Sequence, residues 1–211
     1  MSERTHGEAA VVSGTLVTVG PAVPHEVARL VAIHREGIPY SFNSRLGPDH
    51  MIGLYDVLLA DSVSVVLAAR IGDAPVGVCI ATLDADALSR TVMRSISLSH
   101  WVRMVGEAVR SPRLVANWLE GIWVGRPVFL RGQMVRACLF AIAVDSTIRS
   151  QGVGAALVRG VDDFCRRADC SAYRLDTRVA NKAAQRFYER EGFSNVRRRG
   201  RNTIWVRDLA A

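Results

Sequence analysis

A glycine-rich turn is the first part of the sequence with an evident chemical use. The stretch "DSTIRSQGVGAALV" places Gly152 and Gly154 with one residue between them, after an apolar run and before a helix-forming one. A strand, turn and helix in this order aim free backbone N–H groups and the positive end of the helix dipole at one point, which suits a phosphate or pyrophosphate. Glycine leaves room for such a ligand. Arg149 can add a charge-assisted hydrogen bond.

Two common phosphate-binding motifs do not fit this turn. A Rossmann fingerprint, GxGxxG, needs a third glycine where this chain has Leu157. A P-loop needs a lysine after its last glycine, and Ala155 follows Gly154 here. The pattern that remains is R-x-x-G-x-G. Taken alone, it favours a strand-to-helix turn that uses glycine for its geometry, because short glycine motifs are common by chance.

A second pattern makes the prediction specific. Val144, four residues, and then "RSQGVGA" resemble the acyl-CoA-binding motif of the GNAT N-acetyltransferase superfamily. About thirty residues further on, "NKAAQRFYEREGF" (181–193) resembles the second signature of that superfamily, N-x-x-A-x-x-F-Y-x-x-x-G-F. The two motifs have the expected order and spacing. The resemblance covers the whole architecture and is strongest over residues 138–193.

The resemblance implies how acetyl-CoA, the acyl donor, is held. Its pantetheine arm would lie between two splayed parallel strands and pair with the backbone of Ile142, Ala143 and Val144. Its pyrophosphate would be cradled by the Arg149 side chain and by the amides of Gln151, Gly152, Val153, Gly154 and Ala155. Asn181 would hydrogen-bond the cofactor or hold the loop. Asn181 is also a sound helix N-cap, and the two roles are compatible.

Tyr188 is the catalytic residue that the resemblance implies. The matching tyrosine of many members protonates, or hydrogen-bonds, the departing CoA thiolate. A phenol with a pKa near 10 can give its proton to a thiolate with a pKa of about 8.5 only with help from geometry and polarisation. The alternative for Tyr188 is an aromatic residue that packs in the core, a role that suits its neighbour Phe187 better.

The general base is not assigned by the resemblance. Acetyl transfer needs a neutral amine, so a group must accept a proton, often through water. Many relatives carry a glutamate on the strand before the loop, where this chain has Ala137 and Cys138. The substitutes in the N-terminal half, each with an equally plain structural explanation, are His34, Glu36, Tyr40, His50 and Asp56.

The acceptor side would be built by the first two helices, the loop between them and an insertion at about 85–136. The loop offers aromatic and hydrogen-bonding groups that suit a polar molecule such as an amino sugar: Tyr40, Phe42, Asn43, Ser44 and Arg45. The insertion is predicted as two helices separated at Ser111-Pro112. They either pack on the core or form a basic, Trp-bearing surface that meets a membrane or a lipid-linked acceptor.

Hydrophobic periodicity predicts an α/β (α+β) fold with a mixed central sheet. The expected strands are 14–20, 62–70, 75–83, 138–144 and 172–177, followed by a closing hairpin around Gly200. The expected helices are 24–36, 49–60, 152–168 and 180–191. We therefore expect one GNAT domain over 1–211, with the helical insertion at 85–136.

Composition narrows the class of protein. The chain has 211 residues, a net charge of +7 and 49% hydrophobic residues, which is typical of a globular domain. It has no apolar run long enough to span a membrane and no apolar leader, so a cytoplasmic location is expected. The cysteines and histidines lack metal-ligand spacing, so no metal is expected. The run "RRRGR" fits a solvated turn, and no motif for reading nucleic acid is recognisable.

The sequence thus predicts an acyl-CoA-dependent N-acyltransferase of the EC 2.3.1 type. It would transfer acetyl from acetyl-CoA directly to a primary amine of a small molecule. The alternatives are a protein or peptide N-acetyltransferase, an enzyme with a longer acyl donor, and a catalytically silent acyl-CoA-binding module. The missing strand glutamate favours the silent module. A homodimer is left open.

Overall fold

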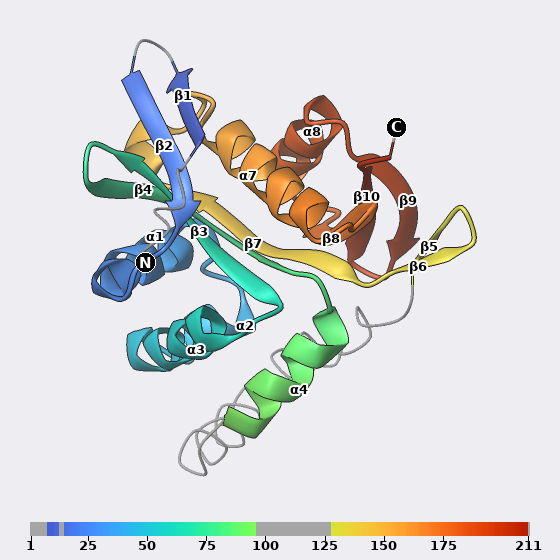
Figure 1. The fold of residues 1–211 in the computed structure, drawn as a ribbon, viewed down its shortest axis with the longest axis horizontal. Helices are drawn as coiled ribbons and strands as arrows, with labels where there is room; N and C mark the ends of the chain where they lie inside the picture. The colour runs from blue at the N-terminus through green and yellow to red at the C-terminus, as the bar shows by residue number, and fades with distance from the viewer. Residues whose placement is uncertain (1–7, 13–14, 96–127, 211) are drawn as a thin grey trace.

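An eight-stranded mixed sheet forms the centre of the protein (Figure 1). The computed structural model describes residues 8–12, 15–95 and 128–210. In spatial order the strands are β1 (Glu8–Val12), β2 (Thr15–Pro21), β3 (Ser64–Ile71), β4 (Ala74–Thr82), β7 (Ala137–Val144), β8 (Ala172–Arg178), β10 (Asn202–Asp208) and β9 (Ser194–Arg199). Only β7 and β8 pair in parallel; all other neighbours in this sheet are antiparallel. The predicted α/β fold with a mixed sheet is confirmed.

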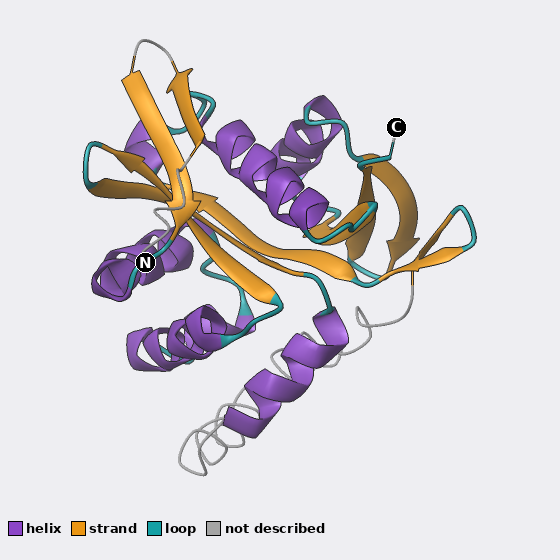
Figure 2. Ribbon diagram, viewed as in Figure 1, coloured by secondary structure: helices purple, strands orange, loops and turns teal. Residues whose placement is uncertain are grey.

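Helices cover both faces of the sheet (Figure 2). The short η1 (Pro24–Glu26) leads into α1 (Val27–Gly37), and α2 (Phe42–Arg45), α3 (Pro48–Ala60), α7 (Val153–Arg167) and α8 (Lys182–Arg190) follow. Figure 1 shows α1 and α3 on one side of the sheet and α7 and α8 on the other. A separate hydrophobic core forms under each pair. The predicted helix boundaries agree closely, but the loop after α1 contains the unpredicted α2, which Ser41 caps by accepting a hydrogen bond from the Ser44 amide at 3.1 Å.

The extent of the predicted helical insertion needs correction. It begins as expected with α4 (Ala85–Ser95), but it ends in a hairpin of β5 (Val128–Leu130) and β6 (Gln133–Val135). The hairpin forms because its alternating apolar side chains are buried against the end of β10. The second expected helix lies outside the described residues. Among the described helices, none is long and apolar enough to cross a bilayer.

The sheet opens between its two parallel strands. Parallel pairing of β7 with β8 is limited to Ala137 with Tyr173 and Cys138 with Arg174. On its other side β7 pairs with β4, and Phe140 is an extra residue in that ladder, because Ile80 faces Ala141 while Ala81 faces Leu139. A bulge of this kind bends and twists its strand. The bend begins where the pairing with β8 ends.

A buried charge network ties β8 and β10 to α7. Asp162 on α7 accepts a hydrogen bond from the Tyr173 hydroxyl at 2.8 Å and forms an ion pair with Arg207 at 2.6 Å. The Asp162 side chain is only 3% exposed, so its charge depends on these partners. The hydrogen bonds from Arg207 to Asp162 raise the pKa of the guanidinium further. This network anchors the second half of the sheet to the helix beneath the first half.

We therefore expect Asp162→Asn to lower the free energy of unfolding by about 2 kcal/mol, because it leaves the Arg207 charge without its partner. Urea denaturation measures this loss. Asp163→Asn is the matched control, since its ion pair with Arg166 is exposed on the same helix and should change stability by less than about 0.5 kcal/mol. Equal losses in the two variants would contradict the role of the network.

Candidate active site

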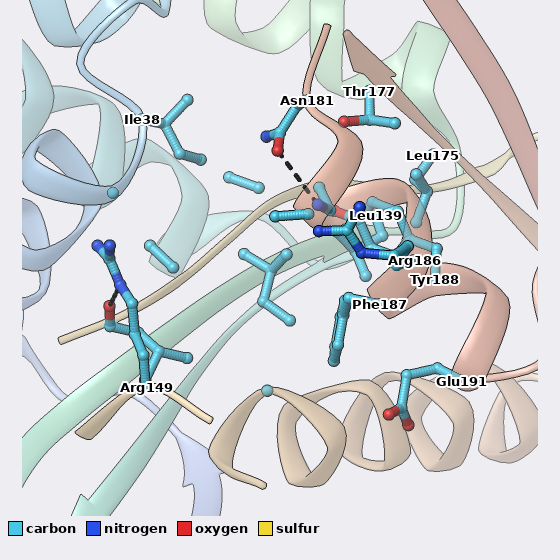
Figure 3. A pocket seen from close by; sticks show the side chains of 18 of the residues that line it. Ile38, Leu139, Arg149, Leu175, Thr177, Asn181, Arg186, Phe187, Tyr188 and Glu191 are labelled. Atoms are coloured by element: carbon cyan, nitrogen blue, oxygen red, sulfur yellow. Dashed lines mark hydrogen bonds between the residues drawn. The ribbon is translucent and has the colours of Figure 1, made fainter. Parts of the chain in front are cut away.

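A pocket of about 790 Å³ occupies the opening between β7 and β8 (Figure 3). Ten of the predicted site residues line it: Ile142, Ala143, Val144, Arg149, Gly152, Val153, Gly154, Ala155, Asn181 and Tyr188. Gln151 is the one predicted residue that does not line the pocket. The structure thus brings together residues from β7, the glycine turn and α8.

Glycine is required at the two positions of the turn for different physical reasons. Gly152 has φ +82°, a left-handed conformation that side chains disfavour, and it is the N-cap of α7. A Cβ on Gly154 would lie 3.2 Å from the Phe187 ring, so this glycine lets α8 pack closely on α7. Close approach of a ligand is therefore not the only reason for either glycine. The turn still leaves the first amides of α7 at the pocket wall.

Arg149 lies at the end of the pocket next to this turn. Its Nε donates a hydrogen bond to the carbonyl of Val144, the last residue of β7, at 3.3 Å (Figure 3). The Arg149 side chain is exposed, and the structure shows no carboxylate paired with it in the described part of the chain. A guanidinium beside a helix N-terminus adds to the positive potential of that terminus.

Tyr188 lies deep in the pocket and also packs in the core. It is 7% exposed and contacts Phe187, Phe193 and Trp205 through its ring. Burial raises the pKa of its phenol, so the hydroxyl stays protonated. The hydrogen bonds among the described residues include none from this hydroxyl, and Tyr188 lines the pocket. The ring therefore has the packing role that was weighed for Tyr188, and the catalytic role of the hydroxyl stays a prediction.

Asn181 connects α8 to the loop after α1. Its side-chain oxygen accepts a hydrogen bond from the Ala184 amide at 3.1 Å, which confirms the predicted N-cap of α8. Its Nδ2 donates to the Tyr40 hydroxyl at 3.4 Å. The contact of Asn181 with the cofactor stays a prediction. The hydrogen bond from Asn181 nevertheless attaches the loop that carries Tyr40 to the wall of the pocket.

Most of the predicted candidates for the general base lie away from the pocket. His34 is buried under the sheet, where its Nδ1 lies 3.0 Å from the Tyr55 hydroxyl, and burial lowers the pKa of the imidazole to about 4. His50 contacts Asn43, and neither Glu36 nor Asp56 lines the pocket. Of the five candidates, Tyr40 alone lines it.

Asp176 is a carboxylate in the pocket that sequence reasoning missed. It lies on β8, two residues beyond Arg174, where pairing with β7 ends. Burial raises the pKa of this carboxyl to about 6, although the charges of Arg174 and Arg199 act in the opposite direction. The Arg174 guanidinium lies 3.4 Å from its Oδ2, and its Oδ1 is buried without a partner in the described residues. The sequence does contain a sign that Asp176 belongs to a site: in "AYRLDT", two charged residues interrupt a buried strand.

The pocket and the sheet around it correspond to a known family. The sequence profile described as the acetyltransferase (GNAT) family matches residues 34–193. The chain belongs to this family. GNAT proteins are acyl-CoA-dependent N-acyltransferases that use acetyl-CoA. The predicted family and the predicted cofactor are therefore confirmed.

Individual relatives of this GNAT chain differ in their acceptors. It is 35% identical over 101 residues to N-alpha-acetyltransferase 30 of Saccharomyces cerevisiae, a match that covers 48% of this chain and 57% of that protein. It is 31% identical over 113 residues to the aminoglycoside N(6')-acetyltransferase type 1 of Klebsiella aerogenes, which covers 53% of this chain and 68% of the relative. Thus the chain spans between about half and two thirds of these curated relatives.

Solved structures share the GNAT fold at low sequence identity. The PaiA N-acetyltransferase of Thermoplasma acidophilum, in complex with coenzyme A, matches with a TM-score of 0.60 at 10% identity, covering 91% of this chain and 98% of that one. At this identity the likeness shows the fold alone. The residues of our pocket fit a CoA-type ligand, because they combine unpaired strand edges, helix-terminal amides and an arginine.

The buried His34 of this GNAT protein should make its stability depend on pH. The folded pKa of about 4 lies below the unfolded value of 6.5, so the unfolded chain binds a proton first. Stability is therefore full above about pH 6.5 and decreases as the pH falls toward 4, by up to about 1.4 kcal/mol per pH unit. We expect His34→Gln to remove that part of the decrease in urea denaturation at several pH values. An unchanged dependence on pH would show that His34 is not buried in its neutral form.

Proposed function

We propose that the chain is a single GNAT domain that transfers an acetyl group from acetyl-CoA directly to the primary amine of a small molecule. One observation carries the proposal: Tyr188 and the buried Asp176 carboxylate both line the pocket between the splayed strands. A proton donor and a proton acceptor in one pocket suit a transfer in which an amine loses a proton and a thiolate gains one.

The cofactor would be held along β7 and at the glycine turn. The inner edge of β7 beyond Cys138 has no strand partner, so the backbone of Ile142, Ala143 and Val144 is available to the amide groups of a pantetheine arm. The pyrophosphate would meet Arg149 and the first amides of α7. In this arrangement the acetyl group lies near Phe140 and Asp176, at the closed end of the opening.

Three groups of the chain would act on the reacting atoms. Asp176 takes the proton of the incoming amine, directly or through water, and burial strengthens it as a base by raising its pKa. A backbone N–H at the Phe140 bulge meets the carbonyl oxygen as negative charge develops on it. Tyr188 donates its hydroxyl hydrogen bond to the departing thiolate. No covalent bond between the acetyl group and the protein is required.

A second acceptor class has specific support. The identity of 35% to N-alpha-acetyltransferase 30 favours the N-terminal amine of a protein or peptide over a small molecule such as an amino sugar. The relative named for aminoglycosides favours a small molecule. The catalytically silent alternative loses its main support, because Asp176 offers the carboxylate that the strand before the loop lacks.

Tyr188→Phe tests the proton donor. We expect kcat to fall about 10²-fold or more while binding of acetyl-CoA is kept, because the hydroxyl acts only on the leaving thiolate. Release of CoA thiol across a panel of amines measures turnover, and the thermal shift with acetyl-CoA measures binding. Tyr55→Phe is the matched control, a buried tyrosine outside the pocket. Full turnover by Tyr188→Phe would refute the assignment, and no thermal shift in the wild type would refute the function itself.

Asp176→Asn tests the proton acceptor through the pH profile. Below about pH 6 the wild type must lose a proton from both the amine and Asp176, so log kcat/KM should rise with a slope of about two. The variant should show a slope of about one and a rate about 10²-fold lower at pH 8. Asp56→Asn, on the exposed side of α3, serves as the control. A variant that keeps the slope of the wild type would exclude Asp176 as the base.

A further inference from the structure

The wall of the pocket opposite the glycine turn is rich in guanidinium groups. Arg174, Asp176 and Arg178 alternate along β8 and so lie on one face of the sheet. Arg199 on β9 adds its charge to the same region, because it acts on the Asp176 carboxyl. Asn202 on β10 pairs with both Arg178 and Arg199 and also lines the pocket. Arg178 thus lines the pocket, whereas Arg174 and Arg199 do not line it and act on the Asp176 carboxyl.

Arg178 is the member of this group that can meet a ligand. It lines the pocket, and its guanidinium carbon lies 4.9 Å from the centre of the Tyr40 ring. Two anchors hold this pair, the hydrogen bond from Asn181 to the Tyr40 hydroxyl and the bond from Gln185 to the Arg178 carbonyl at 3.1 Å. A guanidinium stacked on a ring keeps its N–H edge free for two parallel hydrogen bonds to a carboxylate or phosphate. Among the described residues, no carboxylate takes up that edge.

The position of Arg178 separates it from the phosphate end of the cofactor. Figure 3 shows Arg149 and Thr177, the residue before Arg178, on opposite sides of the pocket. The Tyr40 ring comes from the loop between α1 and α2. The pyrophosphate proposed for the glycine turn and Arg149 therefore does not account for a second anion-binding group on the other side of the pocket. The acceptor amine is the other molecule that enters the pocket, and we take it as the ligand of Arg178.

We propose that Arg178, held against Tyr40, selects small-molecule amines that carry an anionic oxygen group, a carboxylate or a phosphate, close to the amine that is acetylated. The proposal rests on the acetyl transfer proposed above and names the class of its acceptor. An acceptor with an additional positive charge would meet the Arg178 guanidinium, so polycationic amines are disfavoured. An amino sugar phosphate or an amino acid fits the same wall.

The experiment compares acceptors that differ only in the anionic group. Glucosamine is paired with glucosamine 6-phosphate, and alaninamide with alanine, in the thiol-release assay with saturating acetyl-CoA. We expect the anionic member of at least one pair to have a kcat/KM about tenfold higher in the wild type. The pair that shows the preference identifies phosphate or carboxylate as the group. Arg178→Gln should reduce the preference to within about twofold, and Arg178→Lys should restore part of it.

Arg198→Gln is the matched control. It removes one positive charge from the neighbouring hairpin, and Arg198 does not line the pocket. This variant should keep the preference of the wild type. Equal kcat/KM values within both pairs, a preference for cationic aminoglycosides, or an unchanged preference in Arg178→Gln would overturn the proposal while leaving acetyl transfer intact.

A binding measurement decides the case if none of these amines is acetylated. The CoA-saturated protein is titrated by calorimetry with N-acetylglucosamine 6-phosphate, N-acetylglucosamine, N-acetylalanine and N-acetylalaninamide. Preferential binding of an anionic product that is lost in Arg178→Gln supports the anion site independently of turnover. No preference in this titration overturns it. If no amine is acetylated but the anionic products still bind through Arg178, the result contradicts the proposed acetyl transfer and leaves the proposed anion site supported.

Discussion

The end of hydrogen bonding between β7 and β8 is the constraint on which the rest of the structure depends. Parallel pairing stops after Cys138 and Arg174, yet each strand stays paired beyond that point on its outer side, β7 with β4 and β8 with β10. The inner backbone groups beyond that point have no partner within the sheet. Because buried N–H and C=O groups are costly when unpaired, the opening suits an extended ligand with amide groups of its own.

Close packing outside the opening holds the two strands apart. On the β7 side, a Cβ on Gly37 would lie 2.8 Å from the Ala143 side chain, so the end of α1 rests directly on the strand. On the β8 side, Asp162 ties Tyr173 and Arg207 to α7. None of these contacts involves Asp176 or Tyr188, the residues proposed for the chemistry. The shape of the pocket is therefore a property of the fold and does not depend on the residues that would do the chemistry.

Burial acts in the same direction on the two groups proposed for proton transfer. It raises the pKa of the Tyr188 phenol, which keeps the proposed donor protonated, and it raises the pKa of the Asp176 carboxyl, which makes the proposed acceptor a stronger base. The arginines around Asp176 limit its shift, so that it is still ionised near neutral pH. Arg178, on the same face of β8, adds a positive charge to the pocket wall.

The sequence by itself determined the family, the order of most helices and strands, and ten of the residues that line the pocket. It could do so because Arg149, the glycine turn and Asn181 to Phe193 are local patterns whose spacing is set by one strand or one helix. Only the tertiary structure identified Asp176 as the candidate general base and placed the positive charge of Arg178 beside the proposed acceptor site. The sequence shows Asp176 as a charged residue in a buried strand, but its place in the pocket depends on the separation of β8 from β7. Arg178 meets Tyr40 across a long stretch of chain. The β5–β6 hairpin was missed for the same reason: its strands are short, and they are stabilised by packing against β10, a contact between segments far apart in the sequence.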